Sequence, residues 1–254
     1  MSSSYDYIAK IVCIGDSGTG KSSLTIRLCE GRFTQHHDVT IGVEFGSRIV
    51  PVGPPNTPLP SSKPTTVRPP DLSEGLPEPR RAEPKIEQKH MKLSLWDTAG
   101  QETYKSVTRS YFRGASGALL VFDISRRPTF THVTDWLNDL RQIAEPDIVV
   151  VLVGNKSDLA TEEESKREVT VEEAREWARK NGVLEYVETS AKSGEGVENA
   201  FGRVAERIYM NVEAGKYDLN DRRSGVKGPP AGGSVRGGVK LGKTPVKGAA
   251  YGCC

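Results

Sequence analysis

The segment GDSGTGKS, residues 15–22, places glycines, a lysine and a hydroxyl at a spacing that suits phosphate binding. Glycines let the backbone turn tightly, so that successive amide hydrogens face phosphate oxygens, and a following helix adds its positive end. Lys21 can supply a charge to terminal phosphates, and the Ser22 hydroxyl can ligate Mg²⁺. A plain glycine-rich turn is the alternative, but an apolar run before the segment and a helical pattern after it favour the phosphate loop.

A second polar cluster, WDTAGQE at residues 96–102, follows another apolar run. Asp97 is a candidate for second-shell binding of Mg²⁺, and the amide hydrogen of Gly100 can sense a γ-phosphate. Gln101 carries an amide that can orient an attacking water. Alone, such a cluster would indicate a turn, but beside a phosphate loop it is a candidate catalytic segment.

Two further segments, NKSD at 155–158 and SAK at 190–192, suit recognition of a base. Guanine presents two adjacent N–H groups, so both oxygens of Asp158 can accept from it. Adenine would leave this carboxylate unpaired, at a cost of about 1–3 kcal/mol. These segments predict guanine specificity and disfavour the alternative of a P-loop kinase or ATPase.

The elements that must position these residues are apolar runs of strand length separated by amphipathic helical patterns. Helices are expected at 128–144, at 170–182, where Thr170 and Glu173 form a capping box, and at 197–215. The pattern predicts an α/β fold with a mostly parallel six-stranded sheet, helices on both faces, and ligands at the carboxyl ends of the strands. The strands are expected at residues 7–15, 43–50, 91–96, 117–123, 148–154 and 184–190.

The strands at 43–50 and 91–96 have no helical pattern between them and are predicted to form an antiparallel hairpin. Residues 51–84 between them hold 11 of the 16 prolines of the chain. Because proline lacks an amide hydrogen, this stretch is predicted to be a disordered or polyproline-like loop. A tolerated surface insertion is the favoured interpretation; docking onto an aromatic-lined groove and retained intron sequence are the alternatives.

Composition excludes several classes of protein. The 254 residues carry a net charge of only +2, which implies no nucleic-acid partner. No apolar run approaches the roughly 18 residues of a membrane span, the first residues do not resemble a signal peptide, and we expect a cytosolic protein. The four cysteines lack the spacings of a disulfide framework or a zinc site.

Taken together, GDSGTGKS, TIGVEF, WDTAGQE, NKSD and SAK resemble the Ras-like small GTPases. IGVEF (41–45), KLSLWDTAGQE (92–102), YFRGASG (111–117) and LVFDIS (120–125) resemble the Rab branch, most closely its type-four group, with types two and fourteen near. The resemblance implies a P-loop NTPase small G-domain over residues 1–213, interrupted by the insertion at 51–90. Residues 214–254 would then be a flexible, basic, glycine-rich tail.

The resemblance also implies roles for individual residues. Thr40 matches the switch threonine that meets Mg²⁺ and the γ-phosphate, and Phe33 matches the aromatic ring packed against guanine. Gln101 is the implied catalytic residue, and Ser22, Thr40 and Asp97 are the implied Mg²⁺ residues. The implied GTP-binding residues are Ser17, Gly18, Thr19, Gly20, Lys21, Ser22, Ser23, Phe33, Thr40, Gly100, Asn155, Lys156, Asp158, Ser190, Ala191 and Lys192.

Three departures from the family pattern limit what the resemblance implies. Thr103, Tyr104 and Lys105 replace the usual aromatic residue and arginine, which affects recognition of the second switch by activators and effectors. Ser17 occupies a glycine position of Ras itself, and slow turnover is expected. The third departure is the insertion, which lies at the far end of its hairpin, so nucleotide binding should survive.

Cys253 and Cys254 resemble the Rab signal for two geranylgeranyl groups, although incidental exposed thiols are the alternative. Each buried methylene contributes about 0.8 kcal/mol. Residues 216–254 hold eight Lys or Arg and two Asp, a net charge of +6, so the first 215 residues carry −4. Such a tail is attracted to anionic leaflets by about 1 kcal/mol per basic residue.

The expected function is a GTP-hydrolysing switch in vesicle-mediated trafficking on the cytoplasmic face of early and recycling endosomes, with Golgi membranes as the alternative. A guanine-nucleotide-binding scaffold with little hydrolysis is the rival from another class. The implied ligands are Mg²⁺ and GTP or GDP. The implied protein partners are an exchange factor, a GTPase-activating protein, a GDP dissociation inhibitor, a prenylation escort protein and GTP-dependent effectors.

Overall fold

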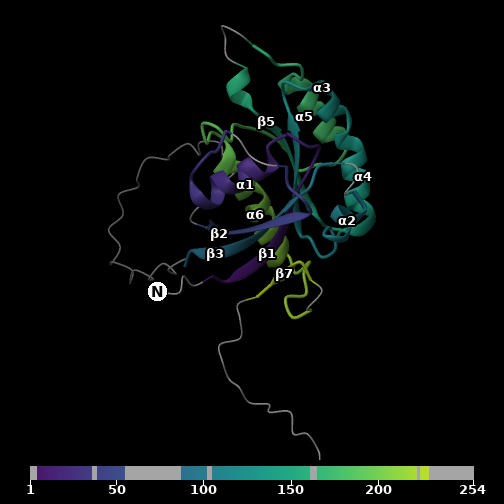
Figure 1. Cartoon of the computed structure of the whole chain (residues 1–254). Coiled ribbons are helices and arrows are strands. Elements are labelled where there is room, and N and C mark those ends of the chain that lie inside the picture. Colours follow the sequence, from purple (N-terminus) through teal and green to yellow (C-terminus); the bar gives the residue numbers. More distant parts are fainter. Residues whose placement is uncertain are drawn as a thin grey trace, which may run out of the picture.

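The computed structural model describes residues 5–35, 39–54, 87–101, 105–160, 165–221 and 224–228. Its centre is a sheet with the strand order β2-β3-β1-β4-β5-β6 (Figure 1). The strands are β1 (Tyr7–Ile14), β2 (Val43–Val52), β3 (Lys89–Thr98), β4 (Gly117–Asp123), β5 (Val149–Asn155), β6 (Tyr186–Thr189) and β7 (Val226–Lys227). The helices are α1 (Lys21–Glu30), α2 (Lys105–Ser110), α3 (Arg127–Thr131), α4 (Val133–Ile143), α5 (Val171–Lys180) and α6 (Val197–Glu213), with a short 3₁₀ turn, η2, at Ser157–Leu159.

The sheet confirms the predicted α/β class. Strands β3, β1, β4, β5 and β6 are parallel, and β2 pairs antiparallel with β3. Every residue of β4 and β5 is buried, because helices cover both faces of the sheet. Figure 1 shows α1 and α6 on one face and α2, α3, α4 and α5 on the other.

Alternate residues of β1 divide the core into two layers. Ile11 and Cys13 face the cluster formed with α1 and α6, whereas Val12 and Ile14 face the cluster formed with α3, α4 and α5. This alternation follows from the two-residue period of a strand. It anchors β1 on both sides and therefore fixes the loop that leaves its carboxyl end.

The hairpin of β2 and β3 is longer than predicted. Its register runs from Val43 opposite Thr98 to Val52 opposite Lys89, so both ends of the predicted interruption at 51–90 belong to the sheet. Pro51 is accommodated because β2 is an edge strand, where a missing amide hydrogen can face away from the ladder. Most of the proline-rich stretch, residues 55–86, lies outside the described residues.

A neck of hydrogen bonds closes the hairpin before the insertion begins. The backbone N–H of Gly53 donates to Glu206 Oε2 on α6 at 3.0 Å, and Gln88 Nε2 donates to the Val52 carbonyl at 2.8 Å. A Cβ on Gly53 would lie 2.5 Å from the Tyr209 ring, so only glycine fits there. The two ends of the insertion are therefore held to α6 and to β2 by these hydrogen bonds.

The described part of the chain adds a seventh strand to the predicted six. β7 pairs antiparallel with Ile8 and Ala9 of β1. Because β4 begins opposite Ile11, this stretch of β1 lies beyond the pairing with β4. Residues 224–228, which the sequence analysis assigns to a flexible tail, thus complete the sheet; residues 229–254 lie outside the described residues. A two-residue strand has no periodicity by which a sequence could reveal it.

The predicted helices are present with adjusted ends. The pattern at 128–144 is two helices, α3 and α4, that meet at His132. Thr170 caps α5 as expected, because its Oγ1 accepts from the Glu173 N–H at 3.2 Å. Within the described residues, no helix combines the length and apolarity needed to cross a membrane.

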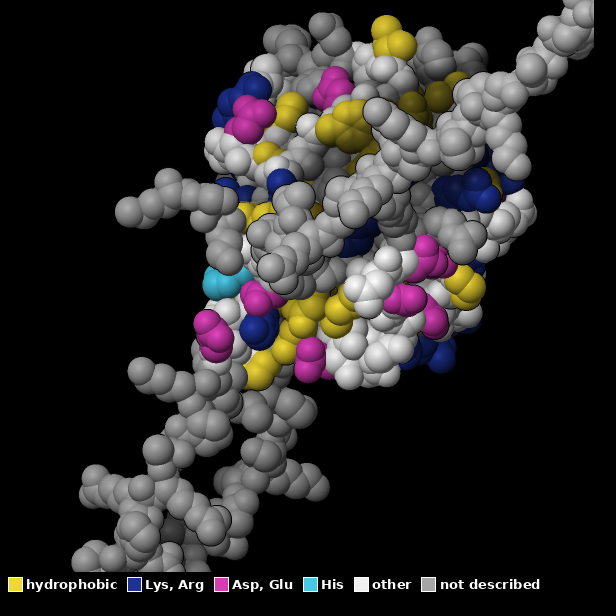
Figure 2. All heavy atoms as spheres, turned by 90° about the horizontal axis from the view of Figure 1, so that it is seen from below, with side chains coloured by type: hydrophobic (Ala, Val, Ile, Leu, Met, Phe, Trp, Pro, Cys, Tyr) yellow, Lys and Arg dark blue, Asp and Glu magenta, His cyan; other side chains and the backbone are white. Residues whose placement is uncertain are grey.

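Figure 2 views the molecule from the end at which β7 lies in Figure 1. On this face, basic and acidic side chains are interspersed, with apolar side chains between them. The described surface seen there therefore carries no single-sign patch.

Candidate functional site

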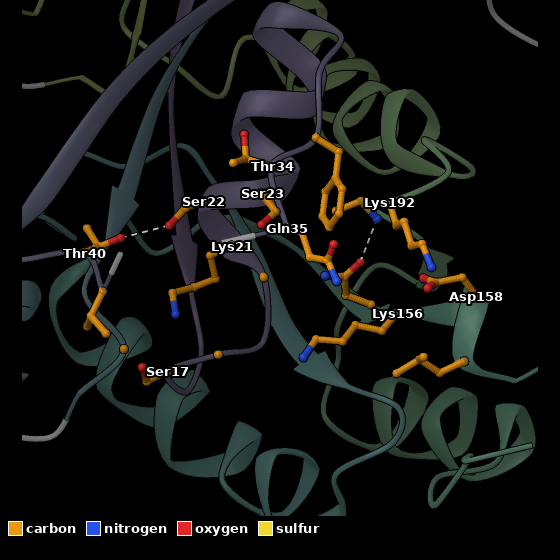
Figure 3. Close-up of a pocket in the computed structure, with 18 of the residues that line it drawn as sticks. Ser17, Lys21, Ser22, Ser23, Thr34, Gln35, Thr40, Lys156, Asp158 and Lys192 are labelled. Carbon is orange, nitrogen blue, oxygen red and sulfur yellow. Dashed lines mark hydrogen bonds between the residues drawn. The ribbon is translucent and has the colours of Figure 1, made fainter. Parts of the chain in front are cut away.

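The carboxyl ends of the parallel strands surround a cavity of about 730 Å³, within the size range of small-molecule sites. Its walls come from the loop after β1, the segment at 33–40, Gly100 after β3, and the loops after β5 and β6. Figure 3 shows Ser17, Lys21, Ser22 and Thr40 at one end and Lys156, Asp158 and Lys192 at the other. The residues of the phosphate loop and those of the predicted base site therefore line one continuous cavity.

The loop between β1 and α1 needs glycine at defined positions. Gly15 has φ 135°, and a Cβ there would lie 2.1 Å from the Val121 carbonyl oxygen. Gly20 has φ 92°, and a Cβ there would lie 2.3 Å from Asn155 Nδ2. Both positions are left-handed and crowded, so the close packing of the loop on β4 and β5 depends on the absence of a side chain.

Lys21 is buried at the floor of this loop. Its Nζ donates to the Gly15 and Asp16 carbonyls, each at 2.8 Å. Burial lowers the pKa of Lys21, and the negative charge of Asp97 opposes this by raising it. The loop therefore holds the ammonium where its positive charge would attract terminal phosphates.

Hydroxyl and carboxylate oxygens gather beside the lysine. Ser22 Oγ and Thr40 Oγ1 are 2.9 Å apart, and the buried Asp97 shares a smaller adjoining cavity with Ser22. This donor set suits Mg²⁺, which binds hard oxygens and usually takes one or two carboxylates together with substrate phosphates. Among the described residues, no group of three His, Cys, Asp or Glu could hold a metal by itself, so the phosphates would have to complete the coordination.

Asn155, at the end of β5, ties three loops together and is 1% exposed. Its Nδ2 donates to the Thr19 carbonyl at 2.8 Å. Its Oδ1 accepts from Thr189 Oγ1 and from the Ala191 N–H, each at 3.2 Å. Asn155 thus sets the separation between the phosphate loop and the two base loops.

Asp158 and Lys156 are each oriented by a partner. Asp158 Oδ1 accepts from Ser190 Oγ at 2.6 Å, and because each carboxylate oxygen can accept more than one bond, both oxygens can still accept from a ligand. Lys156 has φ 71° and its Nζ lies 2.7 Å from Oδ2 of the buried Asp123. Its stem therefore lies along the cavity wall.

A comparison with protein families identifies the family of the chain. The model of the Ras family matches residues 10–59 and 77–210, which is well over half of the chain. The chain belongs to the Ras family. It is therefore a small GTPase switch that binds GTP and GDP, and Mg²⁺ typically accompanies the nucleotide in this family. The match omits residues 60–76, so the proline-rich stretch contains sequence that the family does not share.

Most residues predicted to bind GTP line the cavity of this Ras-family domain. Thr19 and Ser190 are fully buried and act through their neighbours, since the Thr19 carbonyl accepts from Asn155 and Ser190 holds Asp158. Gln101 is half-buried and does not line the cavity. The predicted lipidation sites Cys253 and Cys254, and residues 102–104 of the second switch, lie outside the described residues.

Arg27, which no sequence motif singles out, reaches from α1 to the loop after β6. Its Nε donates to the Ala191 carbonyl at 2.8 Å, its Nη2 donates to the Lys192 carbonyl, and its Nη1 donates to the Gly31 carbonyl at 2.8 Å. The guanidinium therefore holds the base loop to the helix that follows the phosphate loop. No local spacing could reveal this, because its partners on the base loop are more than 160 residues away in the chain. The cavity lining also includes Thr34, Gln35, Val39, Thr98 and Leu159, which the sequence analysis did not single out.

Proposed function

We propose that this Ras-family protein is a GTP-hydrolysing switch of the Rab branch that regulates vesicle-mediated membrane trafficking. The observation that carries the switch is the meeting of both switch segments with the phosphate loop. Thr40 contacts Ser22, and a Cβ on Gly100 would lie 2.5 Å from Lys21 Nζ. A γ-phosphate placed beside Lys21 would lie within reach of both segments.

The conformational step follows from that placement. With GTP bound, Thr40 and the amide of Gly100 would be held by contacts with the γ-phosphate and Mg²⁺, and hydrolysis would release them. Gly100 has no room for a side chain, because its Cβ position is also 2.5 Å from the Ser17 backbone nitrogen. The residue can thus serve as a backbone sensor of the terminal phosphate.

The hydrolysis step is assigned to Gln101, which follows Gly100 directly. Its amide would orient the attacking water, as the glutamine of the second switch does in this class of enzyme. Intrinsic turnover would be slow, and an activating protein would accelerate it by orders of magnitude. Gln101→Leu should abolish activator-stimulated hydrolysis and preserve nucleotide binding; unchanged stimulated hydrolysis would contradict this assignment.

An exposed apolar surface beside the switches supports recruitment of effectors. Ile41 is 79% exposed and Phe45 is 64% exposed. Phe45 packs edge-on against Trp96, with ring centroids 4.5 Å apart, and Trp96 contacts Tyr111. Because these residues adjoin both switch segments, a change in the switches would change the surface offered to a partner.

Membrane attachment is proposed at Cys253 and Cys254 by geranylgeranylation, with endosomal membranes as the destination and Golgi membranes as the alternative. The motifs of the Rab branch and the basic residues of 216–254 support this. The charges on the face in Figure 2 are mixed, whereas the tail is basic and would be attracted to anionic lipid. The proposed regulators are the exchange factor, activating protein, GDP dissociation inhibitor and escort protein named above.

Imaging of the tagged protein and of the Cys253→Ser, Cys254→Ser variant, with early-endosome and Golgi markers, tests the trafficking role. Punctate wild type and diffuse variant are expected. Capture of effectors from a lysate with protein loaded with GDP or a non-hydrolysable GTP analogue tests the switch. Equal capture in both states would instead favour a constitutive scaffold.

A further inference from the structure

Asp16 is a residue of the phosphate loop whose side chain reaches out to another element. Trp136 Nε1 donates to Asp16 Oδ1 at 2.8 Å, and His132 Nδ1 donates to Asp16 Oδ2 at 2.7 Å. Both carboxylate oxygens are thus held by α4 and the residue that caps it. The Asp16 side chain is only 16% exposed, so these bonds are partly shielded from water.

Contacts other than those with Asp16 hold the Trp136 ring and the backbone at His132. His132 caps α4 and Trp136 lies four residues further on, so both side chains project from the same face of the helix. Trp136 is 3% exposed and packs in the core under β4 and β5. The preceding helix is tied to the sheet, because Thr129 Oγ1 accepts from the Asp123 N–H at 3.0 Å. The indole donor is therefore held in place by packing, whereas the His132 ring is 49% exposed and is placed through the backbone of the helix start.

The backbone of Asp16 carries this constraint into the phosphate site. Its carbonyl accepts from Lys21 Nζ at 2.8 Å and from Thr19 Oγ1 at 2.9 Å. A Cβ on Gly100 would lie 2.5 Å from the Asp16 carbonyl carbon. Asp16 thus connects α4, the phosphate-binding lysine and the second switch.

We propose that Trp136 and His132 are positioning residues for nucleotide binding, which act through the Asp16 carboxylate. They hold the first turn of the phosphate loop in the geometry that places Lys21 and the loop amides against the phosphates, and so slow nucleotide release. This inference rests on the nucleotide-binding function proposed above. Neither ring lines the nucleotide cavity, so the effect is exerted through the loop.

The test uses full-length protein and the release of a fluorescent GDP analogue in excess unlabelled GDP. Trp136→Phe keeps the aromatic ring and removes the N–H donor, and it should speed release about tenfold, or about 1.4 kcal/mol. Asp16→Ala should have a similar effect, and the double variant should be no faster than either single variant. Asp16→Asn, which keeps an acceptor for the indole, should recover part of the loss. Trp177→Phe is the matched control, since that indole donates to Thr134 away from the loop, and release should stay within about twofold.

The indole N–H resonances in NMR spectra distinguish a positioning role of Trp136 from a general effect on stability. The chain has three tryptophans, so three indole N–H resonances are expected. Asp16→Ala should shift the Trp136 resonance and leave that of Trp177 in place, at an unfolding temperature within a few degrees of wild type. Wild-type release rates in folded Trp136→Phe and Asp16→Ala, or effects that simply add in the double variant, would overturn the inference. Wild-type protein that bound no guanine nucleotide would instead refute the proposed function, and this inference with it.

Discussion

The two ends of the sheet are built differently. At the carboxyl ends of the parallel strands, each loop is fixed by side chains from distant elements, as Asn155 shows with its three partners. At the opposite end, strands are closed by backbone ladders, Val52 opposite Lys89 and Ile8 opposite Lys227, and the neck adds a bond from the Gly53 N–H to Glu206. The first end positions individual amides around the cavity, whereas the second joins strands and holds the start of the insertion to α6. Extra chain can therefore be added at the second end without disturbing the first.

The largest effect should come from a methyl group in the phosphate loop. In Gly20→Ala, the new Cβ would meet Asn155 Nδ2 at 2.3 Å, in a left-handed backbone conformation. We expect GDP affinity to fall at least hundredfold, or about 3 kcal/mol, measured by titration calorimetry. Gly202→Ala on α6 is the control, because its Cβ position has no neighbour within 4 Å and alanine favours a helix. Similar losses in both variants would mean that the loss does not come from crowding in the phosphate loop.

A buried thiol under the phosphate loop makes that end sensitive to alkali. Burial raises the pKa of Cys13 from 9.0 to about 12. Because the folded-state pKa is above the unfolded one, the contribution is complete below pH 9 and is lost as pH rises toward 12. At pH 10.5, wild type should lose about 2 kcal/mol of unfolding free energy relative to Cys13→Ala, compared with pH 8. Urea denaturation of both proteins at the two pH values measures this, and parallel losses would contradict it.

Removal of the Arg27 guanidinium should have a moderate effect on the base loop. Arg27→Ala loses the bonds to the Ala191 and Lys192 carbonyls, and we expect GDP release to be about tenfold faster, or about 1.4 kcal/mol. Arg48→Ala is the control, since Arg48 lies away from the base loop and forms an exposed ion pair with Glu198 at 3.8 Å. Faster release in both variants would point to lost charge rather than to lost loop bonds.

The sequence predicts the motifs that line the cavity better than it predicts the long-range contacts that hold them. The phosphate loop, NKSD and SAK are predictable because their chemistry is written in consecutive residues, and all three line or support the cavity. Arg27 and the contact of Asp16 with Trp136 are not, because the partners lie 164 and 120 residues apart. The sheet and its hairpin follow from periodicity, but β7 does not, since it is specified by pairing with β1 alone.

The smallest effect on GDP affinity should come from deletion of the insertion, although this is the largest change in sequence. Deletion of residues 55–86 leaves Gly53, Pro54, Glu87 and Gln88 between the paired residues Val52 and Lys89, a four-residue connection of ordinary hairpin length. GDP affinity should stay within about twofold, because the neck lies at the far end of the sheet from the cavity.

Stability should change little or increase, since shortening the loop from 36 to four residues saves at most about 2 kcal/mol of closure entropy. Titration calorimetry and urea denaturation of the deletion variant in the presence of GDP and Mg²⁺ measure both quantities. A tenfold loss of affinity would show that the insertion supports the nucleotide end. It would also mean that the backbone ladder between Val52 and Lys89 does not isolate one end of the sheet from the other.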